Sequence, residues 1–174
     1  MKALSGVAAL MLLMVVTGPA VLAQTDDDDD DQDQAALAKV LTTAKVTLEA
    51  GLTASSAEGR PISGKFEMDE GKLQLSVYTE KSGKFYEVVV DHETGKAAKP
   101  EPITEGGDLA AAKGQSEAMS KAKLSLRAAV GKAVAANAGF RAVSVFPETK
   151  DGHPVATVNL VKGQEWKVVS ESLD

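Results

Sequence analysis

Between residues 35 and 50, the apolar residues of the chain follow the spacing of an α-helix. They recur every three or four positions, which places them on one face and predicts that this face is buried. Gly51 follows directly and can end the helix in the left-handed conformation. The apolar positions are Leu37, Val40, Leu41, Ala44 and Leu48.

A second segment with the same spacing runs from residue 116 to residue 136. Ser116 is of a type that caps helix N-termini, and Gly139 lies just beyond the last apolar position. We therefore predict a second long helix with one buried face. Its apolar positions are Met119, Ala122, Leu126, Val130 and Ala133.

Between these two segments, the period of the apolar residues changes from helical to two. This alternation predicts three strands, at residues 62–68, 73–77 and 85–90. Residues 69–72 and 80–84 separate the strands and contain glycine beside polar residues, as hairpin turns do. The pattern thus predicts an antiparallel arrangement of consecutive strands.

The alternating pattern returns after the second predicted helix. Strands are predicted at residues 141–146, 155–161 and 165–170, with turns at residues 150–152 and 162–163. The order helix, strand, strand, strand therefore occurs twice, which favours an internal duplication.

The two halves align only approximately. Sliding the chain by 80 positions places Tyr86 on Trp166, whereas the middle strands fit better at 81 positions, which places Leu75 on Ala156. The repeated order of elements is the stronger indication of duplication.

The predicted fold class is α+β, with two similar units that each pack a helix on a three-stranded antiparallel sheet. The first unit is expected at residues 35–97 and the second at residues 116–174. Residues 98–115 form the expected linker, because its first part is rich in proline and glycine.

The N-terminus has the pattern of a secretory signal peptide. Lys2 supplies a positive charge, residues 7–16 are apolar, and Gly18-Pro19 ends this run before Ala23. The run is shorter than the about 20 apolar residues that cross a bilayer, so we expect residues 1–23 to be cleaved off after Ala23. The chain has no cysteine, which together with the signal favours a bacterial periplasmic or secreted protein.

The formal net charge of −6 arises from one short acidic segment. Residues 24–34 contain seven aspartates and no apolar residue, so we expect a disordered, solvated segment. They lack the spaced ligands and the turn glycine of a calcium loop. Residues 34–174 hold as many acidic as basic residues, which argues against nucleic acid as a partner and against a polybasic contact with lipid.

The triplet Asp91-His92-Glu93 follows the strand predicted at residues 85–90 and has two interpretations. These residue types occur in metal and catalytic sites, but a zinc site needs three or four converging ligands. The chain has two histidines, and the second is His153. We favour a structural turn in which Asp91 accepts backbone hydrogen bonds and Gly95 adopts a positive φ.

The stretch YEVVVDHETGK, residues 86–96, resembles the PepSY domain family. In that family a strand ends in Asp, and a Thr-Gly pair follows after two or three variable residues. Asp91, Thr94 and Gly95 stand at those positions. The resemblance covers residues 35–97.

The second unit, residues 116–174, matches the family less well. Glu171 stands at the Asp position, and no Thr-Gly pair follows it. The resemblance implies an exported protein without catalytic activity that inhibits or regulates a peptidase. It supplies no catalytic residue.

The sequence contains no phosphate-binding loop, dinucleotide fingerprint or nucleophile motif that would indicate an enzyme. We expect no catalytic, cofactor-binding or metal-ligating residue and no cofactor. The predicted function is binding of a protein or peptide, with a peptidase as the implied partner. The alternative is a small-molecule or lipid carrier that uses the concave sheet face, which needs an apolar pocket. Leu75, Val77 and Tyr86 would fill that space if the alternative is wrong.

Trp166 is the only tryptophan of the chain. A large aromatic side chain is either a core anchor or an exposed binding residue. Core packing is the expectation in a domain with so few aromatic residues.

Overall fold

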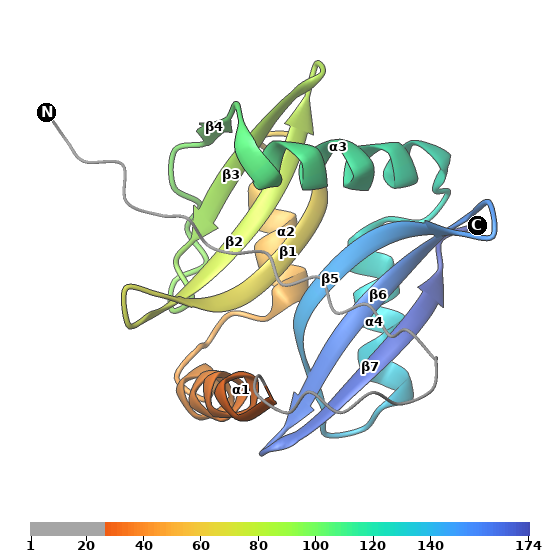
Figure 1. Ribbon diagram of the computed structural model, residues 1–174. Helices are drawn as coiled ribbons and strands as arrows, with labels where there is room; N and C mark the ends of the chain where they lie inside the picture. Colours follow the sequence, from red (N-terminus) through yellow and green to blue (C-terminus); the bar gives the residue numbers. More distant parts are fainter. Residues whose placement is uncertain (1–26) are drawn as a thin grey trace, which may run out of the picture.

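Seven antiparallel strands within residues 27–174 form one sheet, and helices pack on both of its faces (Figure 1). The computed structural model describes these residues, with their side chains from Asp33 onward. The α+β class predicted from the sequence is confirmed. The predicted signal peptide, residues 1–23, lies outside the described residues.

The single helix predicted at residues 35–50 is wrong, because two helices separated by a loop occupy this region. α1 spans Asp27–Leu41 and α2 spans Leu48–Ser55. The Thr47 side chain caps α2 by accepting a backbone hydrogen bond. Gly51 does not end a helix but lies buried within α2.

The acidic segment that was expected to be disordered has helical backbone from Asp27 onward, where it forms the first part of α1. The expectation is therefore wrong for residues 27–34, whereas residues 24–26 lie outside the described residues. Ala38 and Leu41 are buried near the other end of α1. Once that end is fixed by packing, each further helical residue adds one hydrogen bond.

The second predicted helix, residues 116–136, is likewise two helices. α3 spans Gly106–Lys121 and α4 spans Leu126–Ala136. The N-terminal cap that the sequence assigned to Ser116 belongs to Ser125, whose side chain accepts a hydrogen bond from the first turn of α4.

All six predicted strands are present, and each is longer than predicted. A seventh, short strand, β4, lies within the predicted linker at residues 98–115. The strands are β1 (Arg60–Asp69), β2 (Lys72–Lys81), β3 (Lys84–Val90), β4 (Glu101–Ile103), β5 (Arg141–Lys150), β6 (His153–Lys162) and β7 (Glu165–Ser172).

The two predicted hairpin turns of the first half are confirmed. Glu70 and Gly71 join β1 to β2 with φ values of 47° and 76°. Ser82 and Gly83 join β2 to β3 with φ values of 55° and 75°. Positive φ at both central residues is the turn geometry that matches the twist of a two-residue hairpin.

The sequence predicted a separate sheet in each unit, and this prediction is wrong. The strands form one sheet in the order β4-β3-β2-β1-β5-β6-β7. β1 and β5 join the halves through the pairs Gly64–Val145 and Lys65–Ser144. A Cβ atom at Gly64 would lie 3.2 Å from Cδ2 of Leu52, so glycine permits close packing of α2 on this central strand.

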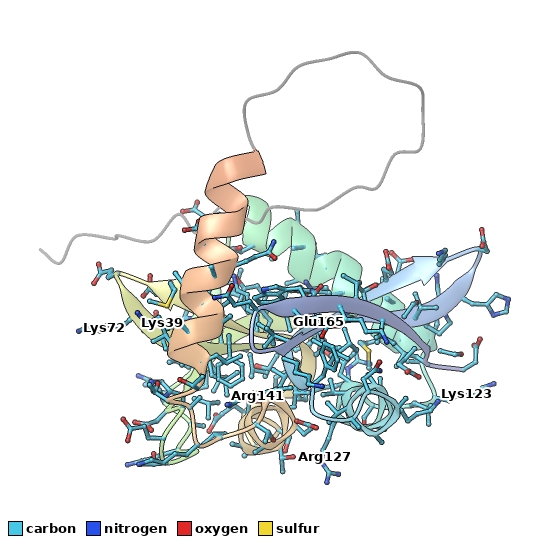
Figure 2. The ribbon with its side chains drawn as sticks, turned by 90° about the horizontal axis from the view of Figure 1, so that it is seen from below. Lys39, Lys72, Lys123, Arg127, Arg141 and Glu165 are labelled. Carbon is cyan, nitrogen blue, oxygen red and sulfur yellow. The ribbon has the colours of Figure 1, made fainter. Side chains whose placement is uncertain are left out.

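The molecule has three layers, which Figure 2 shows from below. α1 and α3 lie on one face of the sheet, and α2 and α4 lie on the other (Figures 1 and 2). Within the described residues, no helix is long and apolar enough to cross a membrane. The large fully buried side chains include Leu48, Leu52, Leu75, Val77, Val88, Leu126, Val130 and Leu160.

The strand pairings of the two halves correspond at a constant offset of 81 positions. Glu80 pairs with Phe85 in the first half, and Val161 pairs with Trp166 in the second. Trp166 therefore corresponds to Phe85, and its alignment with Tyr86 is wrong. The hairpins β2–β3 and β6–β7 both have two-residue turns, so no gap arises between them.

An arginine at the start of each central strand ties the halves together. Arg60, on β1, donates to the carbonyl oxygen of Met119 near the end of α3 at 3.1 Å. Arg141, on β5, donates to the carbonyl oxygens of Leu41, the last residue of α1, and of Ala44 in the following loop, both at 3.0 Å. Each half thus binds the first helix of the other half.

Candidate functional site at the sheet edges

Asp91 forms the turn that the sequence predicts. Its Oδ1 atom accepts hydrogen bonds from the backbone N–H groups of Glu93 at 3.0 Å and Thr94 at 2.7 Å. Gly95 follows with a φ of 76°. The hydrogen bonds from Thr94 and Glu93 hold the pKa of Asp91 below its usual range. Asp91 is therefore a turn-forming residue, and the predicted turn is confirmed.

His92 takes part in this turn through its backbone. Its carbonyl oxygen accepts from the N–H groups of Lys45 at 2.9 Å and Val46 at 3.0 Å, which holds the loop between α1 and α2. His153 lies on β6, where its Nδ1 atom is 3.0 Å from Oδ2 of Asp174. Within the described residues, no three His, Cys, Asp or Glu side chains are grouped as metal ligands would be.

A groove of about 630 Å³ lies beside this turn, between the β1–β2 turn and the loop after β3. Its charged lining includes Asp69, Lys72, Asp91 and Lys96, all of them exposed. An acid–base pair needs two groups in different environments, whereas these four groups are all exposed. The groove therefore offers no argument for catalysis.

A polar cluster lies where the start of α3 meets the sheet. The Lys65 ammonium is 2.6 Å from a carboxylate oxygen of Glu67. Burial, and then the Asp108 carboxylate, raise the pKa of Tyr78 far above its usual range. Burial also raises the pKa of Glu87, to which Glu67 contributes. These side chains come from β1, β2, β3 and α3 and interact with one another. We therefore infer that the cluster helps to hold α3 on the sheet.

The two outer strands of the two halves differ in one respect. The outer edge of β3 is covered by the chain that follows it, because Phe85 pairs with Ile103 and Glu87 with Glu101 of β4. The N–H group of Ala98 also donates to the carbonyl oxygen of Val89 at 2.8 Å. In the first half, the third strand thus has neighbours on both sides.

In the second half, β7 is the last strand of the sheet, and no strand within residues 27–174 pairs with its outer edge. Lys162 and Glu165 flank the two-residue turn, so alternate residues from Glu165 onward bond to β6. The residues between them direct their backbone N–H and C=O groups outward. These outward residues are Trp166, Val168, Ser170 and Ser172.

The side chains along this edge are unusually accessible for a strand. Val168 is 62% exposed, whereas Trp166 is half-buried and packs against the core. Charged residues or covering segments normally protect an edge strand from pairing with another chain. β7 also carries the charged residues Glu165, Lys167 and Glu171, but Val168 beside Lys167 is apolar and exposed. An exposed apolar residue among outward-pointing backbone groups suits the addition of a further strand.

The alternating apolar pattern predicts a strand here but does not distinguish Val168 from its neighbours. The available signal was the pair Trp166 and Val168, which share one strand face in the last predicted strand. Trp166 is only partly a core anchor, because it packs against the core but is only half-buried. No protein-family model, curated protein or solved structure matches the chain.

Proposed function

We propose that the chain is a non-enzymatic binding module that takes up an extended segment of another protein as a strand beside β7. The observation that carries this proposal is the contrast between the two halves. Residues of β4 pair with β3 from Phe85 to Glu87, and the corresponding positions of β7, Trp166 to Val168, have no such neighbour within residues 27–174. Main-chain hydrogen bonds give affinity in this binding mode.

We further propose that both halves are PepSY-like units that arose by duplication. The constant offset of 81 positions between the pairings of β2–β3 and β6–β7 supports the duplication. The turn that Asp91, Thr94 and Gly95 form supports the PepSY-like character of the first half. The resemblance makes an exported bacterial peptidase the proposed partner, and periplasm or secretion the proposed location.

The carrier alternative is not favoured by any observation. Leu75 and Val77 are completely buried between α2 and the sheet, and Tyr86 is half-buried. A Cβ atom at Gly51 would lie 2.5 Å from Cδ2 of Leu75, which shows how closely α2 lies on the sheet. Side chains therefore fill the space that a carried molecule would need there.

A proline substitution at one position of β7 tests the proposal. Libraries of displayed random peptides are selected on the protein, and binding of the recovered peptides is measured on two variants. Val168→Pro removes an N–H group that points away from β6, so the sheet remains intact while strand addition loses a donor. Val168→Thr keeps the N–H group and the β-branched shape. We expect binding to be lost in the first variant and kept in the second.

The peptidase role is tested separately with a purified exported bacterial peptidase. We expect the protein to lower its activity, and Val168→Pro to abolish the effect.

In the peptide experiment, peptides that bind the proline variant as well as the original chain would refute strand addition at β7. A melting temperature close to that of the original chain verifies that the variant is folded.

A further inference from the structure

The side chains beside the outer edge of β7 determine which extended segment fits it. We propose that the occupant is a segment of another protein, antiparallel to β7, in which an acidic residue lies between two apolar residues. This inference rests on the proposed function, because it describes the ligand of the same edge. The direction follows the rest of the sheet, in which every pairing is antiparallel, including that of β4 with β3.

The apolar positions follow from Trp166 and Val168. The Lys167 side chain contacts Asn137, directly after α4. Trp166 and Val168 alternate with Lys167 along the strand, so both of their side chains lie on the opposite face of the sheet. Residues directly opposite each other on neighbouring strands also share a face and contact each other. In the first half, where β4 covers the edge of β3, Ile103 lies opposite Phe85, the residue that corresponds to Trp166. Apolar residues of the segment opposite Trp166 and Val168 would bury the valine side chain, which is 62% exposed.

The acidic position follows from Lys167, whose side chain lies on the other face, toward α4. Of the two carboxylates of β7 on this face, Glu171 has a cation beside it. Glu171 lies 3.7 Å from the ammonium group of Lys132, and Glu165 is directly opposite Lys162 in the register.

Lys167 instead donates a hydrogen bond to Oδ1 of Asn137, an uncharged group. The residue that the segment places opposite Lys167 is the one between its two apolar positions. A carboxylate there gains an attractive cross-strand pair, whereas a lysine is repelled. The edge of β7 therefore favours the order apolar, acidic, apolar.

Two synthetic peptides test the inference. They are identical except for their centres, which are Val-Glu-Val in one and Val-Lys-Val in the other. Their affinities are measured on the original protein, on Lys167→Glu and on Lys123→Glu, whose exposed lysine lies between α3 and α4. We expect the original protein to prefer the glutamate peptide by about fivefold. The preference should reverse in Lys167→Glu and remain in Lys123→Glu.

The outcomes separate this inference from the proposed function. If both peptides bind equally well to the original chain and to Lys167→Glu, and Val168→Pro abolishes binding, the inference is refuted while strand addition stands. If neither peptide binds, or if Val168→Pro binds unchanged, both fail. The inference also fails if light scattering shows a dimer that Val168→Pro dissociates and that the glutamate peptide does not.

Discussion

Arg141 is the residue that secures the end of α1. Its guanidinium group donates to carbonyl oxygens of the loop after α1 and lies 5.2 Å from the centre of the Phe66 ring. Burial lowers its pKa, and the Glu49 carboxylate counteracts this effect. Three backbone carbonyl groups accept hydrogen bonds from its terminal nitrogens. We predict that Arg141→Gln lowers the free energy of unfolding by about 3 kcal/mol, because these partners lose a charged donor.

Urea unfolding measures this change. Arg127→Gln is the matched control, because Arg127 is exposed on α4 and its replacement should change stability by no more than about 0.5 kcal/mol. Equal effects of the two substitutions would show that α1 does not depend on Arg141.

Glu87 is the residue whose titration should be visible in stability. Burial raises its pKa above the ordinary value of 4.5, and Glu67 and Asp108 add to this effect. Glu101 of β4 lies directly opposite, and Lys65 is the cation among the groups that face it. A carboxyl group with a raised folded-state pKa binds more protons in the folded state, so its contribution to stability falls as pH rises above about 4.5.

We predict that Glu87→Gln gains stability relative to the original chain as pH rises from 4.5 toward neutrality. Melting temperatures of both proteins across this range measure the difference. Glu105→Gln, at an exposed position before α3, serves as the control and should show a constant difference. A constant difference for Glu87→Gln as well would mean that its carboxyl group ionises as it does in the unfolded chain.

At the scale of elements, two glycines within helices should respond oppositely to alanine. Gly51 of α2 faces Leu75, and an added Cβ atom would lie 2.5 Å from Cδ2 of that leucine. Gly131 of α4 has no atom within 4 Å of the position of an added Cβ. We predict that Gly51→Ala destabilises the protein by about 1–3 kcal/mol through overpacking. Gly131→Ala should stabilise it by up to about 1 kcal/mol through helix propensity.

Chemical denaturation of the two variants tests this pair of predictions, and each variant is the control of the other. Stabilisation by both substitutions would mean that α2 can move away from the sheet without loss.

The strands and turns were predictable because their causes are local. Alternating apolar residues define each strand, and pairs such as Glu70-Gly71 and Ser82-Gly83 define the turns by their own conformational freedom. The cap at Ser125 was also a local signal, since a serine precedes the buried Leu126, but an apolar pattern that continued through it concealed the break.

The breaks within the predicted helices have causes that are distant in the sequence. The N–H groups of Lys45 and Val46 donate to the carbonyl oxygen of His92, and those of Lys123 and Leu124 donate to that of Leu173. These loops exchange helical hydrogen bonds for bonds to residues many positions away. Helical spacing cannot show that exchange, and the apolar pattern therefore predicted one helix in each half.

At the scale of the whole molecule, the central pairing of β1 with β5 was not predictable. Gly64 lies within a strand pattern, which is a general sign of close backbone approach, but it does not identify Val145 as its partner. The open edge of β7 follows only once this pairing fixes the strand order. The sequence therefore predicted the strand that forms the candidate site, but only the structure shows that this strand lies at the edge of the sheet.

The asymmetry of the two edges is the basis of the functional account. Corresponding strands lie at the two sides of the sheet, and residues 97–103 cover one of them. Figure 1 shows β4 beside β3, whereas β7 is the outermost strand at the other side of the sheet. A segment beside β7 would give the second half the neighbour that the first half has.

Amide hydrogen exchange at β7, followed by NMR with and without the bound glutamate peptide, tests this account most directly. In the free protein, the N–H groups of Trp166, Val168 and Ser170 should exchange quickly, and those of Lys167 and Val169 slowly, because the latter two bond to β6. Binding should slow the exchange of Trp166, Val168 and Ser170 to the rates of their neighbours. Slow exchange of these three groups in the free protein, or unchanged exchange after binding, would contradict strand addition at β7.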